Sequence, residues 1–223
     1  GASVDLEAGE AACFVRATEP VLSISAGKAW FPAEPPPEHP QVLVPLNDAS
    51  KVSQLATPEK RLQRTSGWSL PHRTPGQFTV QTVEDAERGP CLELRLIPDK
   101  PLAWAMLHEY TVLKFAEPVT AAGPVSQVGV WVKGNGGWGE VAWELRNERG
   151  DTWLTTGVYW DWPAKLCINF DGWHFLHLSL PEKLRTGVQV TGLAITMPRE
   201  VLQVTEMAPV KELSVRLSDI CVY

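Results

Sequence analysis

The sequence lacks any long apolar run. No stretch approaches the roughly 20 consecutive apolar residues that a membrane-spanning helix needs, and no basic-then-apolar leader opens the chain. We therefore expect a soluble, processed fragment, monomeric and without a membrane partner.

Clustered positive charge is also missing. The 20 Lys and Arg residues are scattered singly along the chain against 26 Asp and Glu residues, and the formal net charge is −6. Phosphate backbones require a basic patch or stripe. Nucleic acid is therefore excluded as the expected partner.

Cysteine is scarce and unpaired in sequence. Cys13, Cys91, Cys167 and Cys221 are far apart and form no C-x-x-C pair, which argues against zinc ribbons and thioredoxin-like redox chemistry. Buried free thiols are the simpler interpretation. A Cys91–Cys221 disulfide stays open, because both residues lie in strand-like runs and the first and last strands of a sandwich are often neighbours.

Convincing amphipathic helices are absent, and alternating apolar residues separated by turn residues predict strands instead. The 223 residues, 44% of them hydrophobic, are enough for one sizeable core. This pattern predicts an all-β fold, an antiparallel β-sandwich of jelly-roll type. We expect its main strands at 91–97, 107–115, 126–133, 140–147, 153–160, 165–170, 173–180, 188–197 and 212–222, with a short helix or loop at 55–64.

The chain divides at a proline-rich stretch. Residues 1–31 are predicted to be a short β segment, the end of an upstream domain. Residues 32–41 contain five prolines, which favour an extended, stiff linker. Residues 42–223 form the predicted sandwich.

The string GNGGWG at 134–139 matches the dinucleotide-binding pattern G-x-G-x-x-G. A phosphate-binding loop must open a helix. Here the alternating strand EVAWELRN follows, with Val141, Trp143 and Leu145 on one face. The string therefore predicts a β-hairpin loop.

Catalytic arrangements are not apparent. Glycosidases need two carboxylates about 5 to 10 Å apart, whereas Glu140 and Glu144 lie about 13 Å apart along one strand. His174 and His177 form H-x-x-H, but on a strand their side chains point to opposite faces and cannot share a metal. We expect a protein that is not an enzyme.

Tryptophan is the compositional anomaly, with ten residues against six Phe and three Tyr. Indole rings suit both cores and the stacking of sugar rings. Trp160 and Trp162, in the string YWDWP, and Trp138, at the tip of the glycine-rich loop, are the expected exposed stacking residues; plugging the end of the core is the alternative role for Trp160 and Trp162. Tryptophans inside regular strands are expected to be mostly core: Trp131, Trp143, Trp153 and Trp173. The expected hydrogen-bonding partners of a sugar are Asp161, Arg146, Asn135, Glu144 and His177.

The strings VGVWVKGNGGWGEVAWELRNERGD, INFDGWHFLHLSLP and LSVRLSDICVY resemble the galactose-binding-like β-sandwiches that occur as carbohydrate-binding modules and accessory domains of bacterial polysaccharide-degrading enzymes. The resemblance covers roughly residues 42–223. It implies a carbohydrate ligand, a catalytic domain upstream in the same polypeptide, and a bacterial protein that is secreted or held at the cell surface. It also implies a structural calcium ion, for which Asp48 and Asp219 are the candidate ligands.

Three hypotheses follow from the sequence. The first is a non-catalytic module that binds a polysaccharide or oligosaccharide and targets an appended glycoside hydrolase or lyase. The second is a structural sandwich that braces a catalytic domain and has no ligand of its own. The third is a small jelly-roll lyase or hydrolase, which requires Glu144, His177 and a neighbouring acid or Tyr in one groove.

Overall fold

The computed structural model describes residues 38–55, 63–64, 73–99, 101, 108–155, 167–202 and 207–223. Within these ranges the chain forms strands and two short 3-10 turns, and it contains no helix of a length and apolarity that could cross a membrane. Residues 1–37, which include the expected upstream segment and most of the expected linker, lie outside the described residues.

The first layer is a six-stranded sheet. Its order is β12 (Asp171–Ser179), β8 (Gln127–Asn135), β16 (Ser214–Val222), β6 (Gly89–Ile97) and β5 (Gln77–Asp85), with β1 (Gln41–Val44) also paired to β16. All its pairs are antiparallel.

The second layer is an eight-stranded sheet. Its order is β2 (Val52–Leu55), β7 (His108–Phe115), β13 (Gln189–Pro198), β9 (Gly139–Arg146), β10 (Thr152–Thr155) and β3 (Gln63–Arg64). β11 (Cys167–Ile168) also pairs with β9, and β4 (Arg73–Pro75) with β7; β4 and β3 run parallel to their partners. β14 (Glu200–Leu202) and β15 (Met207–Pro209) form a separate antiparallel pair. The short turns are Ala49–Lys51 and Glu182–Leu184.

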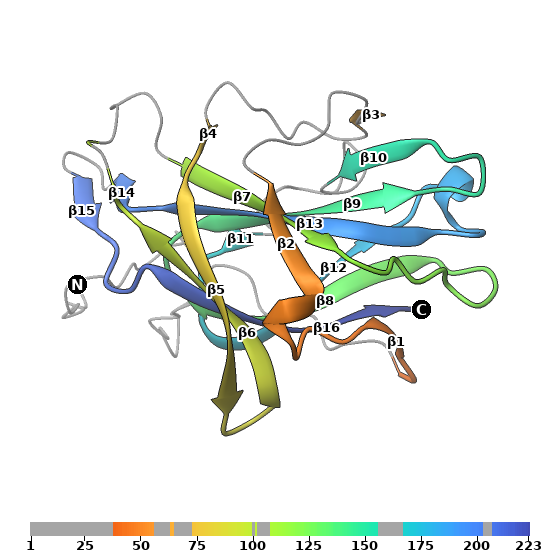
Figure 1. Ribbon diagram of the computed structural model, residues 1–223, viewed down its shortest axis with the longest axis horizontal. Helices are drawn as coiled ribbons and strands as arrows, with labels where there is room; N and C mark the ends of the chain where they lie inside the picture. Colours follow the sequence, from red (N-terminus) through yellow and green to blue (C-terminus); the bar gives the residue numbers. More distant parts are fainter. Residues whose placement is uncertain are drawn as a thin grey trace, which may run out of the picture.

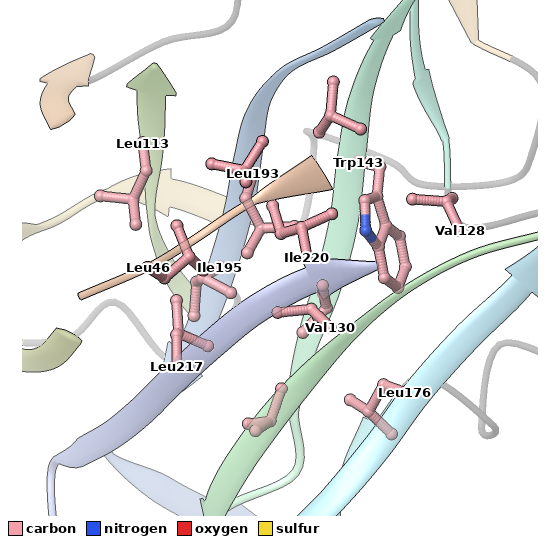
Figure 2. Close-up of a cluster of buried hydrophobic side chains, with 14 of the residues drawn as sticks. Leu46, Leu113, Val128, Val130, Trp143, Leu176, Leu193, Ile195, Leu217 and Ile220 are labelled. Carbon is pink, nitrogen blue, oxygen red and sulfur yellow. The ribbon is translucent and has the colours of Figure 1, made fainter. Parts of the chain in front are cut away.

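The core lies between the two sheets (Figure 1). Alternate residues of each strand face inward, so that Val130 and Val132 of β8 meet Trp143 of β9 and Leu193 of β13 in one cluster of buried side chains. Figure 2 shows Trp143 among these aliphatic side chains. Trp143 and Trp153 are core residues as expected, with 0% and 3% of their surface exposed.

These layers confirm the predicted all-β antiparallel sandwich. The chain changes sheet between β6 and β7, again before β8 and again before β9, a pattern typical of jelly rolls. The nine expected strands correspond to β6–β13 and β16, although the predicted 153–160 strand is described only to Thr155. The long strand β5 was not predicted.

The prediction of a hairpin at 134–139 is wrong. β8 belongs to the six-stranded sheet and β9 to the eight-stranded sheet, so the loop that joins them arches across the end of the sandwich. The physical reason is the apolar face of each strand: Val132 and Val141 both point into the core, but from opposite layers.

The described cysteines Cys91, Cys167 and Cys221 are free thiols, and Cys91 and Cys221 are buried. If the register of β16 with β6 is continued past Leu217, Cys91 lies opposite Ser218. Ser218 and Cys221 pair with Trp131 and Gly129, two residues apart on β8. Cys91 and Cys221 are therefore offset by two residues along neighbouring strands. That separation is about 8 Å between Cα atoms, beyond the roughly 7 Å that a disulfide spans without backbone movement. The alternative of a Cys91–Cys221 bridge is therefore not realised in this structure.

Gly192 on β13 lies between Lys114 on β7 and Glu144 on β9. A Cβ atom at this position would lie 2.6 Å from the Leu113 carbonyl oxygen. Without a side chain at 192, Lys114 reaches across β13 to form an ion pair with Glu144.

We predict that Gly192→Ala lowers the free energy of unfolding by about 1–3 kcal/mol, because the added methyl group overpacks a site walled by backbone. Urea denaturation measures the effect. Val119→Ala is the control; Val119 is 44% exposed, so its change should stay within about 0.5 kcal/mol. Equal stability of Gly192→Ala and the parent would contradict this account.

Candidate functional site

The predicted site residues are distributed over several parts of the molecule. Asn135 and Trp138 lie together in the loop between β8 and β9, whereas Arg146 lies at the other end of β9. Glu144 is on the eight-stranded sheet and His177 on the six-stranded sheet. Trp160, Asp161 and Trp162 lie outside the described residues, and their role stays a prediction.

Glu144 is buried, with 1% of its surface exposed. Its Oε1 atom forms the ion pair with Lys114 and accepts a hydrogen bond of 2.6 Å from the Thr191 hydroxyl. Glu144 and His177 belong to different sheets, and each lies on the face turned away from the core. The groove that the third hypothesis required is therefore not formed.

The two histidines of H-x-x-H point to opposite faces of β12, as predicted. The His174 ring stacks on Phe170 at a centroid distance of 4.0 Å, and burial lowers its pKa. His177 is on the outer face, stacked with Phe175 at 5.6 Å. The two rings cannot bind one metal ion.

The loop from Asn135 to Gly139, here called the arch loop, is fixed by hydrogen bonds to two other segments, one at Ile168 and Phe170 and the other at Glu212. The Asn135 side chain donates to the Glu212 carbonyl at 2.6 Å and accepts from the Gly137 amide at 2.9 Å. The Gly136 amide donates to the Phe170 carbonyl at 2.9 Å, and the Trp138 amide to the Ile168 carbonyl at 3.0 Å. The loop therefore has one well-defined conformation.

Trp138 has an unusual backbone conformation within this loop. Its φ is 58°, in the left-handed region that costs a residue with a side chain roughly 1–2 kcal/mol. The neighbours Gly136, Gly137 and Gly139 show that glycine is readily used here, yet the strained position carries the largest side chain. Such outliers cluster at ligand-binding and active sites.

Polar residues lie near the half-buried Trp138 along the chain and across the β11–β9 pair. β11 pairs Cys167 with Glu140 and Ile168 with Gly139, so Asn169 follows next to Trp138. Asn169 is 7% exposed, and its buried Nδ2 donor has no hydrogen-bond partner among the described residues. Glu140 is half-buried and Asp171 is exposed. An indole beside amide and carboxylate groups can stack on an apolar ring face and hydrogen-bond to its hydroxyl groups.

The outer face of the six-stranded sheet carries two further tryptophans. Trp131 on β8 and Trp173 on β12 were expected among the core tryptophans, but both are half-buried and face away from the core. The correction follows from strand alternation, because their neighbours Val130, Val132 and Leu176 occupy the inward positions. Strand assignment alone could not tell which face of each strand would be inward.

Asp85 links four elements on this outer face. It accepts hydrogen bonds from Lys133 Nζ at 2.8 Å, from Arg216 Nη1 at 2.7 Å and from Trp173 Nε1 at 2.9 Å. Its side chain is 0% exposed. Burial alone would raise the pKa of Asp85, but hydrogen bonds from Lys133, the Glu87 amide, Trp173 and Arg216 outweigh it and hold the pKa well below its usual range.

Asp48 and Asp219, the candidate calcium ligands, lie on separate elements. Asp48 caps the 3-10 turn Ala49–Lys51, and hydrogen bonds from the Ser50 hydroxyl and amide lower its pKa. Asp219 forms a bulge in β16 with φ 21°. Among the described residues no group of three or more His, Cys, Asp or Glu side chains is placed to hold a metal ion. A calcium ion held by Asp48 and Asp219 therefore stays a prediction.

Comparisons with known proteins find a likeness in architecture only. No protein-family model matches it, and no curated protein does. Solved structures resemble it in architecture. One is a carbohydrate-binding module of the β-sandwich superfamily (11% identity, TM-score 0.43, covering 79% of this chain and 58% of that one). Another is TmCBM61, solved with β-1,4-galactotriose (12%, 0.36, 67% and 88%).

A third similar structure is the enzymatically active domain of bacteriophage CBA120 tailspike protein 4 (11% identity, TM-score 0.38, covering 81% of this chain). This chain spans about a fifth of the tailspike chain's length, 21%. At these identities and TM-scores the comparisons assign no ligand to this chain. The class that the structure itself defines is an all-β, largely antiparallel sandwich.

We predict that Trp138→Gly is more stable than Trp138→Ala by about 1 kcal/mol, because only glycine adopts φ 58° without strain. Thermal or urea denaturation of the two variants measures the difference. Glu140, which has no positive φ, is the control, and there alanine should be the more stable residue. If the Gly variant is more stable than the Ala variant at both positions, or less stable at both, the backbone of Trp138 is not strained.

We also predict that Asp85 makes stability depend on pH in acid. Because the pKa of Asp85 is lowered in the folded protein, the stabilisation that Asp85 provides is fully present above the pKa of Asp in the unfolded chain, about 3.9. This stabilisation is lost as the pH falls below that value. At pH 7, Asp85→Asn should cost about 3 kcal/mol, since it breaks a buried ion pair. The gap between parent and variant, measured by urea denaturation, should shrink towards pH 3. Glu84→Gln, at an exposed neighbour on β5, should follow the parent, and a gap that stays constant would refute the role of Asp85.

Proposed function

We propose that this protein is a non-catalytic module that binds a polysaccharide or oligosaccharide. The observation that carries the proposal is Trp138, a large indole kept at a strained φ of 58° in a loop fixed by hydrogen bonds. A strained bulky residue in a glycine-rich loop reduces stability, and such strain is typical of residues that contact a ligand.

A sugar fits the chemistry around Trp138. The axial C–H groups of a pyranose give it an apolar face for the indole, and its hydroxyls both donate and accept hydrogen bonds. The carboxylates of Glu140 and Asp171 supply acceptors near the loop. Because the hydrogen bonds of Asn135 fix the loop, little conformational entropy would be lost on binding.

Binding is favoured over hydrolysis by the exposure of the nearby acids. A glycosidase keeps its general acid in an apolar pocket, whereas Asp171 is exposed and Glu140 is half-buried. The proposal includes a targeting role, in which the module holds an appended glycoside hydrolase or lyase on its substrate outside a bacterial cell.

We predict that Trp138→Gly weakens binding about fivefold or more, because a stacked aromatic contact contributes about 1 kcal/mol or more. Affinity gels containing xylan, β-1,4-galactan, glucomannan or polygalacturonate, together with intrinsic tryptophan fluorescence, measure it. Arg146→Ala, at the opposite end of β9, is the control and should bind like the parent.

Two outcomes of these gels would contradict the proposal. If the parent binds no polysaccharide, the sandwich is better explained as a structural brace for a catalytic domain. If Trp138→Gly binds like the parent while a Trp160→Ala/Trp162→Ala variant does not, the ligand contacts the segment singled out by the YWDWP string and not the arch loop.

A further inference from the structure

Arg88 lies flat against a tryptophan on the outer face of the six-stranded sheet. It belongs to the turn between β5 and β6, and its Cζ atom is 3.4 Å from the centroid of the Trp131 ring and 5.5 Å from that of Trp173. At such distances a guanidinium stacks on the indole, which leaves its N–H groups directed sideways, parallel to the ring.

The donors of Arg88 are not used within the described part of the chain. Lys133 and Arg216 both form ion pairs with Asp85, and Arg95 lies near Glu93 and Glu212. For Arg88, the described residues provide two aromatic rings but neither a hydrogen bond nor an ion pair. A half-buried guanidinium whose N–H donors are unused within the described residues can donate hydrogen bonds to a ligand.

The Asp85 cluster fixes the position of Arg88. Asp85 Oδ1 accepts a hydrogen bond of 3.0 Å from the Glu87 amide, which sets the turn one residue before Arg88. The same carboxylate binds Lys133 on β8, Arg216 on β16 and Trp173 on β12. The tip of the β5–β6 hairpin is therefore held over the outer face, and Arg88 with it.

Charges near Arg88 select against an acidic ligand. Asp219, Glu87 and Asp85 lie close enough to interact with the Arg88 charge, and the whole chain carries a formal net charge of −6. Lys133 and Arg216 on this face are paired with Asp85, so a carboxylate or phosphate approaching Arg88 would gain little from them and would also approach Glu87 and Asp219. Neutral hydroxyl groups accept hydrogen bonds from the guanidinium without this repulsion.

The surface formed by Arg88, Trp131 and Trp173 continues from the arch loop along β8 and β12. β12 and β8 pair Asp171 with Asn135 and, two residues on, Trp173 with Lys133. Two residues along a strand span about 7 Å, so Trp173 begins roughly one sugar residue away from the loop end of the sandwich. A ligand in chain form can reach both places.

We propose that Arg88, Trp131 and Trp173 form a second binding surface for neutral sugar residues, which extends the arch-loop site along a glycan chain. This inference rests on the proposed function, because it takes the same class of ligand. It adds that the ligand is a neutral chain several residues long, contacted along the sheet as well as at the loop.

Calorimetric titration with β-1,4-galacto- and xylo-oligosaccharides of one to six residues tests the proposal, with polygalacturonate as the acidic comparison. Arg88→Ala should weaken hexasaccharide binding about tenfold and leave mono- and disaccharide binding unchanged, whereas Trp138→Gly should weaken binding at every length. Arg88→Lys keeps the charge but not the flat stack, and should also lose affinity for the long ligand. Arg95→Ala is the control, since Arg95 lies on the same sheet near Glu93.

The outcomes separate this proposal from the proposed function. Binding that depends on Trp138 but is identical in parent and Arg88→Ala at six residues would overturn the second surface alone. Arg88-dependent binding of polygalacturonate that weakens steeply with salt would overturn the neutral ligand. A parent that binds no oligosaccharide would overturn both. Circular dichroism spectra that match the parent, and melting temperatures well above the titration temperature, show that altered binding does not reflect unfolding.

Discussion

Packing of two apolar sheet faces against each other is the constraint on which the rest of the structure depends. Val130 and Val132 on one layer and Trp143 and Leu193 on the other all lose contact with water, which is the dominant favourable term in folding. Because β8 and β9 belong to opposite layers, the residues between them must arch across the end of the sandwich. The arch loop thus results from core packing, and Trp138 is the residue that it presents with a strained backbone.

Burial on the inner faces also determines what the outer faces carry. Strand alternation that directs Val130 and Val132 inward directs Trp131 and Lys133 outward, where they meet Arg88, Asp85 and Trp173. The arch-loop residue Asn135 lies one further step along the same side of β8. The arch loop and the surface around Arg88 are therefore adjacent along the same side of β8. For this reason one glycan chain is proposed to contact both.

The strands and the fold class followed from the sequence, because alternation and turn residues are local signals. Which face of a strand turns inward is not a local signal, so the same expectation was right for Trp143 and Trp153 and wrong for Trp131 and Trp173. The hairpin at 134–139 was predicted wrongly, since sheet membership depends on partners distant in the chain. Arg216 binds Asp85 across 131 residues, and neither this contact nor the stack of Arg88 on Trp131 has a local signature. The strain at Trp138 could not be predicted from the sequence either, because its φ depends on the conformation of the whole arch loop.

The indole N–H resonances of the tryptophans give the most direct test of the claim that Trp138 contacts a sugar. An ¹⁵N-labelled sample titrated with β-1,4-galactan or xylan fragments reports each indole separately, and Trp138→Phe assigns the signal. We predict that the Trp138 resonance moves with saturation while those of the core residues Trp143 and Trp153 stay in place. A titration in which other tryptophans shift and Trp138 does not would contradict the assignment of the arch loop as the binding site.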